Sequence, residues 1–409
     1  MSYKKISNYL LIKEIDKREG KDVYLGLDTL NNSLVSIKLV PSSTLENIQS
    51  LQSFKQALHI HNAMEHNNIL KLIAQEKTKN NIYLILEYPN GGNLREYLNY
   101  YKKNNNKPLP EEMVQKIIRQ ISNGLEYIHS KNVIHRNIRL ETIYINYDDK
   151  TKEVNRTNPI NVSTLIMSLD GKFTVKIGDF EFSKELLNDS GTRSICFTPL
   201  TVAPDIFVNK NEKGYNKSVD LWSLGTITYE LIIGEPPFNG TSLKEVFEEI
   251  SKGKYVYPNN IDISIECISF INGLLQFDPN KRMKWEDIKK HPFLTGDIKN
   301  FKKINIGVNS YNGNLKEFEM DSKNCNNFLW IIYKDNNKIG IDLDKINYDW
   351  INKDINMYYC DKELSKHEKE EGNKSKSDDW EVVTYKTLGF DSNNTLHKNN
   401  KQDNGFYFL

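Results

Sequence analysis

Three short stretches of this 409-residue chain carry side chains whose types suit chemistry on charged groups. Lys38 ends the stretch VSIK and could bind an anion, while Asp179 begins the stretch DFE and could bind a metal cation. Between them, VIHRNIRLETIYIN at 133–146 places Asn137 in a turn ahead of a short predicted strand. A carboxylate at this point could accept a proton, whereas the amide of Asn137 has no lone pair basic enough to do so.

Strands and one helix are predicted around Lys38. LVSIKLV at 34–40 and IYLILEY at 82–88 have the length and β-branched content of buried strands. Between them, SLQSFKQALHIHNAMEH at 50–66 predicts a helix. The region from about 8 to 92 is therefore expected to be rich in strands.

Helices are expected to dominate from 93 to about 294. Apolar residues recur there at helical spacing, as in the segments 111–130 and 218–234. The polar segment at about 146–171 predicts an elongated loop or a hairpin between two short strands. Together these patterns predict an α+β fold in which a small β-rich lobe precedes a larger helical lobe.

The remainder, 295–409, is rich in Asn, Lys and Asp, and its polar segment 367–379 predicts partial disorder. The segment 328–351 within it is apolar enough to fold. With 55 Lys+Arg against 54 Asp+Glu, the overall charge gives no indication of nucleic acid or an anionic membrane as a partner. The apolar runs are too short to span a bilayer, and the four scattered cysteines suit a reducing compartment. We therefore expect a cytoplasmic protein.

Several short motifs follow one another at ordered intervals along the chain. They are V-S-I-K ending at Lys38, E-Y-P at 87–89, H-R-N at 135–137, D-F-E at 179–181, A-P-D at 203–205, D-L-W-S-L-G at 220–225, and Arg282 ahead of H-P-F at 291–293. In this order the chain resembles eukaryotic protein kinases of the Ser/Thr type over 8–294. The resemblance implies a bilobal fold with an N-lobe at 8–86, a hinge at 87–92 and a C-lobe at 93–294 that carries the 146–171 insertion. The segment 1–7 precedes it.

The resemblance implies that the catalytic loop has lost its chemistry. Asn137 replaces the aspartate that accepts the proton of the substrate hydroxyl, a group that contributes about 100- to 10,000-fold to the rate. Thr142 replaces the metal-binding asparagine, and Arg139 replaces the loop lysine, keeping the charge with a different reach.

The nucleotide side of the kinase pattern is also incomplete. Asp16, Arg18 and Lys21 stand where the phosphate-covering loop has its three glycines, and Gly20 lies one position off this register, as in a hairpin turn. The ATP-pocket equivalents are Lys38, Leu86, Glu87 and Tyr88. Ala57, beside Gln56, occupies the place of the glutamate that holds the kinase lysine, so Lys38 could form a structural ion pair with Asp179 or keep a phosphate contact.

Asp179 is retained as the residue of metal-binding type, but Glu181 replaces the glycine of the same motif. A glycine there lets the segment change conformation, so Glu181 indicates a stiffer hinge. The alternative is that Glu181 supplies a second acidic ligand. The expected cofactor is thus ATP with Mg²⁺, bound weakly or not at all.

Residues that hold the kinase architecture together are present. By resemblance, Asp220 bonds the backbone of the 135–137 turn, and Asp205 pairs with Arg282. Arg136 could also read a phosphate on the segment between Asp179 and Asp205. The hydroxyls available for this are Thr192, Ser194, Thr198 and Thr201, which could equally be ordinary loop residues.

One stretch of the tail, SDDWEVV at 377–383, stands out from its polar surroundings. Trp380, with two acids before it and Val383 after it, resembles the linear motif that binds ubiquitin-like autophagy modifiers through strand addition. The alternative is a strand that packs back on the kinase-like lobe.

The sequence as a whole predicts an inactive Ser/Thr kinase, a pseudokinase, that acts as a scaffold or allosteric regulator of other protein kinases or signalling proteins. One alternative is a weakly active or unorthodox ATP-dependent Ser/Thr kinase that relies on Lys38, Asp179 and solvent. Another is a nucleotide-sensing switch without turnover.

Overall fold

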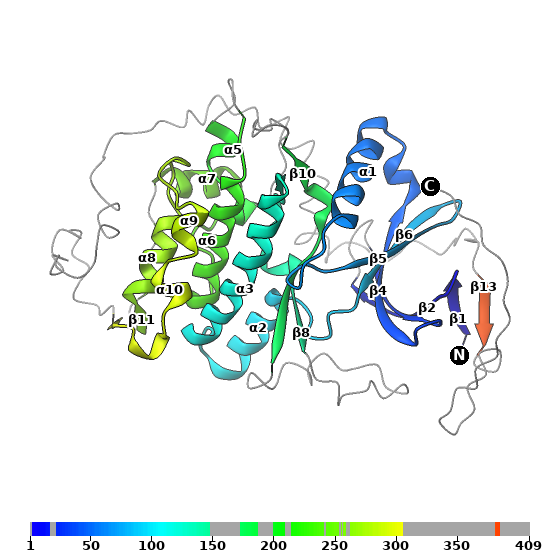
Figure 1. Cartoon of the computed structure of the whole chain (residues 1–409), viewed down its shortest axis with the longest axis horizontal. Coiled ribbons are helices and arrows are strands. Elements are labelled where there is room, and N and C mark those ends of the chain that lie inside the picture. Colours follow the sequence, from blue (N-terminus) through cyan, green and yellow to red (C-terminus); the bar gives the residue numbers. More distant parts are fainter. Residues whose placement is uncertain are drawn as a thin grey trace. The chain divides into compact units, whose positions relative to one another are not determined.

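A computed structural model describes most of the first 305 residues and one short segment near the end of the chain. The described residues are 2–16, 22–147, 172–186, 199–208, 214–240, 243–252, 255, 257–258, 262–305 and 381–384. They fall into two compact units (Figure 1). The sheet unit takes its residues from 1–47, 72–88 and 357–409, and the helical unit from 48–71 and 89–356.

The sheet unit is one antiparallel sheet in the order β13-β1-β2-β3-β4-β6-β5. Its strands are β1 (Ser2–Ile6), β2 (Tyr9–Asp16), β3 (Val23–Asp28), β4 (Ser33–Pro41), β5 (Leu72–Lys77), β6 (Asn81–Glu87) and β13 (Glu381–Thr384), and η1 (Ser42–Leu45) follows β4. The central strand β4 lies between β3 and β6, with Lys38 opposite Val23 on one side and Leu84 on the other. Its alternate residues Val35, Ile37 and Leu39 are buried in the core of this unit.

The tail contributes a strand to this sheet. Glu381–Thr384 pairs antiparallel with β1, so that Lys4 faces Val382 and Lys5 faces Glu381. The two valines and the threonine are β-branched and suit a strand, and the pairing satisfies backbone groups at an edge of β1. The tail stretch therefore packs back on the sheet, as one of its two predicted interpretations requires. Trp380 lies outside the described residues.

The helical unit is built around two long helices, α3 and α6, which pack side by side (Figure 1). Its helices are α1 (Ile48–Asn62), α2 (Leu94–Asn105), α3 (Glu111–Ser130), α5 (Asp205–Val208), α6 (Ser218–Ile233), α7 (Leu243–Lys252), α8 (Ile265–Leu274), α9 (Trp285–Ile288) and α10 (Pro292–Thr295). The shorter elements are β7 (Val133–Ile134), η2 (Leu140–Thr142), β8 (Ile143–Tyr147), β9 (Phe173–Ile177), η3 (Phe180–Phe182), β10 (Lys184–Glu185), η5 (Pro199–Thr201), β11 (Asp262–Ser264), η6 (Ile298–Asn300) and β12 (Lys303–Asn305).

Apolar spacing explains these helices. In α3 the residues Val114, Ile117, Ile118 and Ile121 recur at intervals of three and four, and all are fully buried. Almost every residue of α6 is buried, so this helix forms the centre of the unit's core. It ends at Gly234, whose φ of +88° favours glycine.

Two pairs of short strands position the loops between the helices. β7 pairs antiparallel with β10, and β8 pairs antiparallel with β9. These pairings fix both ends of the loop that contains Asn137 and the turn that contains Asp179. The predicted pair of strands flanking the 146–171 segment is therefore present, while 148–171 lies outside the described residues.

The predicted strands at 34–40 and 82–88 and the helices at 111–130 and 218–234 are confirmed to within one residue at each end. The helix predicted at 50–66 instead spans Ile48–Asn62. Beyond its end, the backbone N–H of Asn68 donates to the His66 ring, 3.1 Å away. The helix also groups with the helical unit rather than with the predicted N-lobe.

Several predictions fall on residues outside the described part of the chain: Arg18, Gly20, Lys21, Thr192, Ser194, Thr198, the fold of 328–351 and the disorder of 367–379. Of the four cysteines, Cys267 is described, and its thiol is buried and free. Across the described helices, none combines the length and apolar character needed to cross a membrane.

Candidate functional site

The carboxylate of Asp220 anchors the loop that follows β7. Asp220 Oδ1 and Oδ2 accept the backbone N–H groups of Arg136 and His135, each at 2.8 Å. Oδ2 also lies 2.8 Å from Nε2 of His129. The predicted bond between Asp220 and the 135–137 turn is confirmed, and it holds Arg136 in a left-handed conformation with φ +64°.

The protonation of this anchor follows from its partners. Trp285 Nε1 donates to Nδ1 of His129 at 3.0 Å, so the N–H of His129 points to Asp220 from Nε2. Burial would raise the pKa of Asp220, but the hydrogen bond and charge of His129 and the groups of His135 outweigh it and lower that pKa. The carboxylate is thus kept ionised within the core.

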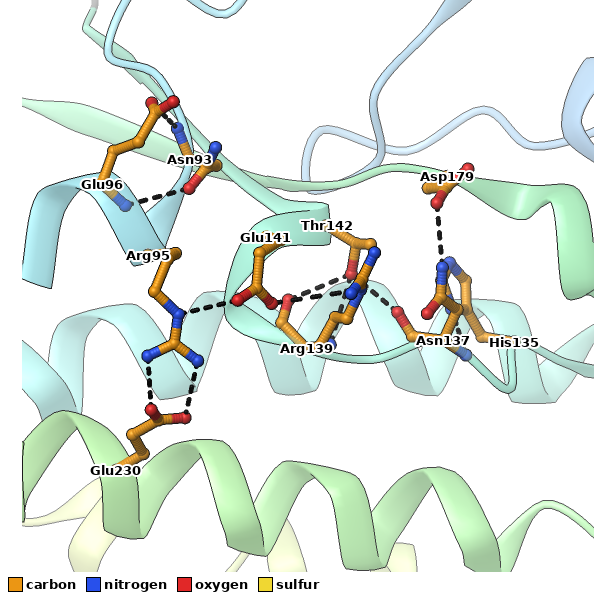
Figure 2. Close-up of polar contacts among 10 residues, drawn as sticks. All are labelled: Asn93, Arg95, Glu96, His135, Asn137, Arg139, Glu141, Thr142, Asp179 and Glu230. Atoms are coloured by element: carbon orange, nitrogen blue, oxygen red, sulfur yellow. Dashed lines mark hydrogen bonds and ion pairs between the residues drawn. The ribbon is translucent and has the colours of Figure 1, made fainter. Parts of the chain in front are cut away.

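Asn137 faces Asp179 across the site (Figure 2). Its Nδ2 donates to Oδ2 of Asp179 at 2.9 Å, and the residue is only 2 % exposed. The backbone N–H of Asn137 donates to Nδ1 of His135 at 3.3 Å. An amide that donates to a carboxylate is a hydrogen-bond donor at this position and takes up no proton.

Thr142 turns its hydroxyl back into its own loop. Oγ1 lies 2.7 Å from the carbonyl of Asn137 and 3.0 Å from that of Arg139, and it accepts the Arg139 N–H at 3.3 Å. The carbonyl of Thr142 accepts the N–H of Gly178 at 2.9 Å. Thr142 is 2 % exposed, so it ties the Asn137 loop to the Asp179 turn from within.

Arg139 and Arg95 approach the same carboxylate of Glu141. Nε of Arg139 is 4.0 Å from Glu141 Oε2, which is too long for a hydrogen bond, and this buried nitrogen has no hydrogen-bond partner within the described part of the chain. Arg95 instead donates from Nε to Glu141 Oε1 at 2.7 Å, and its guanidinium binds both oxygens of Glu230 (Figure 2).

The two glutamates respond differently to Arg95. Burial would raise the pKa of Glu141, but Arg95 outweighs it and lowers that pKa. Burial raises the pKa of Glu230, and Arg95 only partly opposes this because the carboxylates of Glu141 and Glu235 add to the rise. Nothing in the sequence pattern indicated this clamp, which joins three separate elements.

The Asp179 turn is packed by aromatic rings. Phe180 stacks on His61 with ring centres 4.5 Å apart and meets His135 edge to face at 4.9 Å. His135 Nε2 lies 3.1 Å from the carbonyl of Gly178, and burial lowers the pKa of His135. Asp179 itself has φ +61°. Glu181 lies half-buried in η3.

The protein kinase domain family matches residues 14–294. The chain belongs to this family. Its fold is accordingly the α+β, bilobal fold of protein kinases. The ordered motifs of the sequence thus identified the family correctly.

Several kinases of known name are similar to this kinase-domain chain. The Ser/Thr kinase ATG1 of Kluyveromyces lactis is 30% identical over 351 residues, and atg1 of Dictyostelium discoideum is 30% identical over 296. These alignments cover 79% and 71% of this chain and 40% of each relative. The probable Ser/Thr kinase PLK of Dictyostelium discoideum is 27% identical over 292 residues, covering 71% of this chain and 27% of the relative. The chain therefore spans less than half the length of these relatives.

The residues predicted to be ATP-pocket equivalents lie in the sheet unit. Lys38 is half-buried in the middle of β4, and Leu86 and Glu87 end β6, followed by Tyr88. Asp16 ends β2 opposite Val23. In the helical unit, Ala57 of α1 is 4 % exposed and Gln56 is exposed.

The architectural pair of the kinase domain is confirmed. Arg282 donates from Nη2 to Asp205 Oδ1 at 2.8 Å and from Nη1 to Oδ2 at 3.2 Å, and both side chains are almost fully buried. Arg136 donates to the carbonyl of Phe182 at 2.5 Å and to the hydroxyl of Tyr215 at 3.2 Å. Thr201 is buried.

Proposed function

We propose that this protein kinase domain does not transfer phosphate and acts as a scaffold or allosteric regulator in intracellular signalling. The observation that carries the proposal is the hydrogen bond from Asn137 Nδ2 to Asp179 Oδ2 at 2.9 Å. Where the kinase pattern has an acceptor for the substrate's proton, this chain has a donor already committed to a neighbouring carboxylate.

Protein kinases in general use ATP with Mg²⁺, and the residues here fit the metal poorly. Asp179 Oδ2 is occupied by the Asn137 amide, and the hydroxyl of Thr142 is directed at backbone carbonyls of its own loop. No cluster of three or more His, Cys, Asp or Glu side chains suited to a metal occurs within the described residues. We therefore derive no chemical step through a metal ion at this site.

Nucleotide binding without turnover is the second candidate. It is favoured by Lys38, which lies half-buried at the centre of the sheet as a phosphate-binding lysine would, together with Leu86, Glu87 and Tyr88. If the protein proves active, the expected activity is that of an ATP-dependent Ser/Thr protein kinase, which its relatives carry in their names.

The proposal is tested by incubating the purified chain with radiolabelled ATP, Mg²⁺ and a general protein substrate, beside an active Ser/Thr kinase. We expect no incorporation by the wild type. Asn137→Asp should gain nothing, because Thr142 and Arg139 still depart from the kinase pattern. Steady labelling that scales with protein and is lost in Asp179→Ala would overturn the proposal.

Thermal unfolding with ATP, with and without Mg²⁺, separates a scaffold from a nucleotide switch. A ligand present at a hundredfold excess over its Kd stabilises a protein by about 2.7 kcal/mol. We expect ATP to change the temperature of unfolding very little, with or without Mg²⁺. A shift that disappears in Lys38→Met, without incorporation of label, would favour the switch.

The partners we propose are other protein kinases or signalling proteins in the cytoplasm. The tail motif adds a specific case, a ubiquitin-like autophagy modifier bound through Trp380 and Val383. Pairing of 381–384 with β1 uses one edge of this strand. Titration of such a modifier with the wild type and with the Trp380→Ala, Val383→Ala double variant tests the contact, which is absent if both bind equally.

A further inference from the structure

The side chain of Asn137 is fixed by the loop around it. Its backbone N–H donates to His135 Nδ1, its carbonyl accepts from Thr142 Oγ1 at 2.7 Å, and its Nδ2 donates to Asp179 at 2.9 Å. With 2 % exposure, the amide has little room to rotate away. It is held facing the carboxylate of Asp179, as Figure 2 shows.

The backbone conformation at Asp179 calls for support from its surroundings. Its φ of +61° is a left-handed conformation that a residue with a Cβ adopts only at a cost, so surrounding contacts must hold it. A carboxylate oxygen can be stabilised by an N–H donor or by a cation, and the two compete for the same lone pairs.

We infer that Asn137 takes the place of a metal ion at Asp179, so that the 135–142 loop and the Asp179 turn keep their arrangement without any divalent cation. The inference rests on the proposed function, because a site that needed Mg²⁺ for transfer would have to displace this amide. Asn137 is thus more than the loss of a catalytic base. It also positions the Asp179 turn against the 135–142 loop.

The opposite residue type shows why the amide matters. With aspartate at 137, a carboxylate oxygen would take the place of Nδ2 and lie beside Oδ2 of Asp179. Two such anions stay close only with a proton or a cation between them. Asparagine and aspartate have nearly the same size, so exchanging them reverses the hydrogen-bonding character without creating a cavity. The exchange therefore replaces the donor by a charged acceptor and leaves the packing unchanged.

The experiment measures the midpoint of thermal unfolding, Tm, in EDTA and in millimolar Mg²⁺, Ca²⁺ or Mn²⁺, without nucleotide. The wild type should show the same Tm in EDTA and with each cation. Asn137→Asp should unfold at a Tm lower by roughly 5 °C in EDTA, and added cation should recover most of this loss. The replacement Asn300→Asp, at an exposed position of η6, makes the same change of charge and should show neither effect.

A reciprocal variant covers the case in which Asn137→Asp does not fold. The double replacement Asn137→Asp, Asp179→Asn restores one donor and one carboxylate with the direction of the bond reversed. We expect its Tm in EDTA to approach that of the wild type. The inference fails if the wild type gains as much Tm from cations as Asn137→Asp does, or if neither Asn137→Asp nor the reciprocal variant behaves as expected. These results are independent of phosphate transfer, which alone decides the proposed function.

Discussion

The candidate site has two sides that keep the protein kinase pattern to very different degrees. The anchoring side comprises Asp205, Asp220 and Arg282. The chemical side comprises Asn137, Arg139 and Thr142. Residues of the first group match the kinase pattern, while those of the second depart from it, although Asn137 and Thr142 are as deeply buried as the anchors.

The difference shows that folding and chemistry make separate demands on one loop. Asp220 satisfies backbone N–H groups that would otherwise be buried without partners, and both oxygens of its carboxylate accept such bonds. Asn137 and Thr142 form good hydrogen bonds of their own with Asp179 and the loop backbone. The loop is therefore held by hydrogen bonds with an amide at 137 and a hydroxyl at 142.

The largest effect is expected from breaking the anchoring side at Asp220. Asp220→Asn replaces one accepting oxygen by a donor that faces the N–H groups of His135 or Arg136, at a site with 0 % exposure. Loss of a buried charged acceptor should lower the free energy of unfolding by about 3–5 kcal/mol. Urea unfolding of the wild type and of Asp220→Asn at pH 7 measures this loss of free energy.

The matched control is Glu112→Gln on α3, whose carboxylate pairs with Lys116 at 2.9 Å while 53% exposed. An exposed pair of this kind contributes about 0.5 kcal/mol or less. Equal losses in the two variants would mean that the anchoring side does not hold the loop, and the comparison between the two sides would collapse.

Much of the fold could be predicted because its signals are local. The strands around Lys38 and the helix at 111–130 are recognisable from β-branched runs and from apolar spacing alone. The end of α1 was misplaced because the helical pattern of the sequence continues through 63–66, where the structure has no helix. The strand at 381–384 stayed ambiguous, since its pairing with β1 joins opposite ends of the chain.

The site could be predicted in its residue types but not in its contacts. The position of Asn137 within an ordered set of motifs indicated that a base is missing, whereas its bond to Asp179 depends on a tertiary approach between separate turns. The same holds for Arg95, which binds Glu141 and Glu230 from a third element. Such contacts have no periodicity in the sequence and leave no pattern there.

An intermediate effect is expected from pH, through His291, which caps α10 in the helical unit. Burial lowers its pKa from 6.5 to about 4, and its Nδ1 accepts the N–H of Phe293 at 3.2 Å. Between these values the unfolded chain binds a proton that the folded protein excludes, so stability falls as the pH falls below about 6.5. By pH 5 the loss from this group should be about 2 kcal/mol.

The variant His291→Asn isolates this contribution. Asparagine can still cap α10 by accepting the N–H of Phe293, but it does not titrate. Urea unfolding at pH 7, 6 and 5 should show a flatter decline for His291→Asn than for the wild type, whatever the other groups contribute. Parallel curves would show that His291 is protonated as readily in the folded protein as in the unfolded chain.

The smallest effect is expected on the chemical side, at Thr142. Thr142→Val keeps the shape but removes the hydroxyl that bonds the carbonyls of Asn137 and Arg139, and this should cost about 1–1.5 kcal/mol in urea unfolding. Thr142→Ser, which keeps the hydroxyl, should cost less. The ranking of the two variants matters more than the size of either loss. If the hydroxyl has a structural role, Thr142→Ser must be more stable than Thr142→Val. If Val equalled or exceeded Ser in stability, packing of the methyl group rather than the hydrogen bonds would explain why threonine is tolerated in this loop.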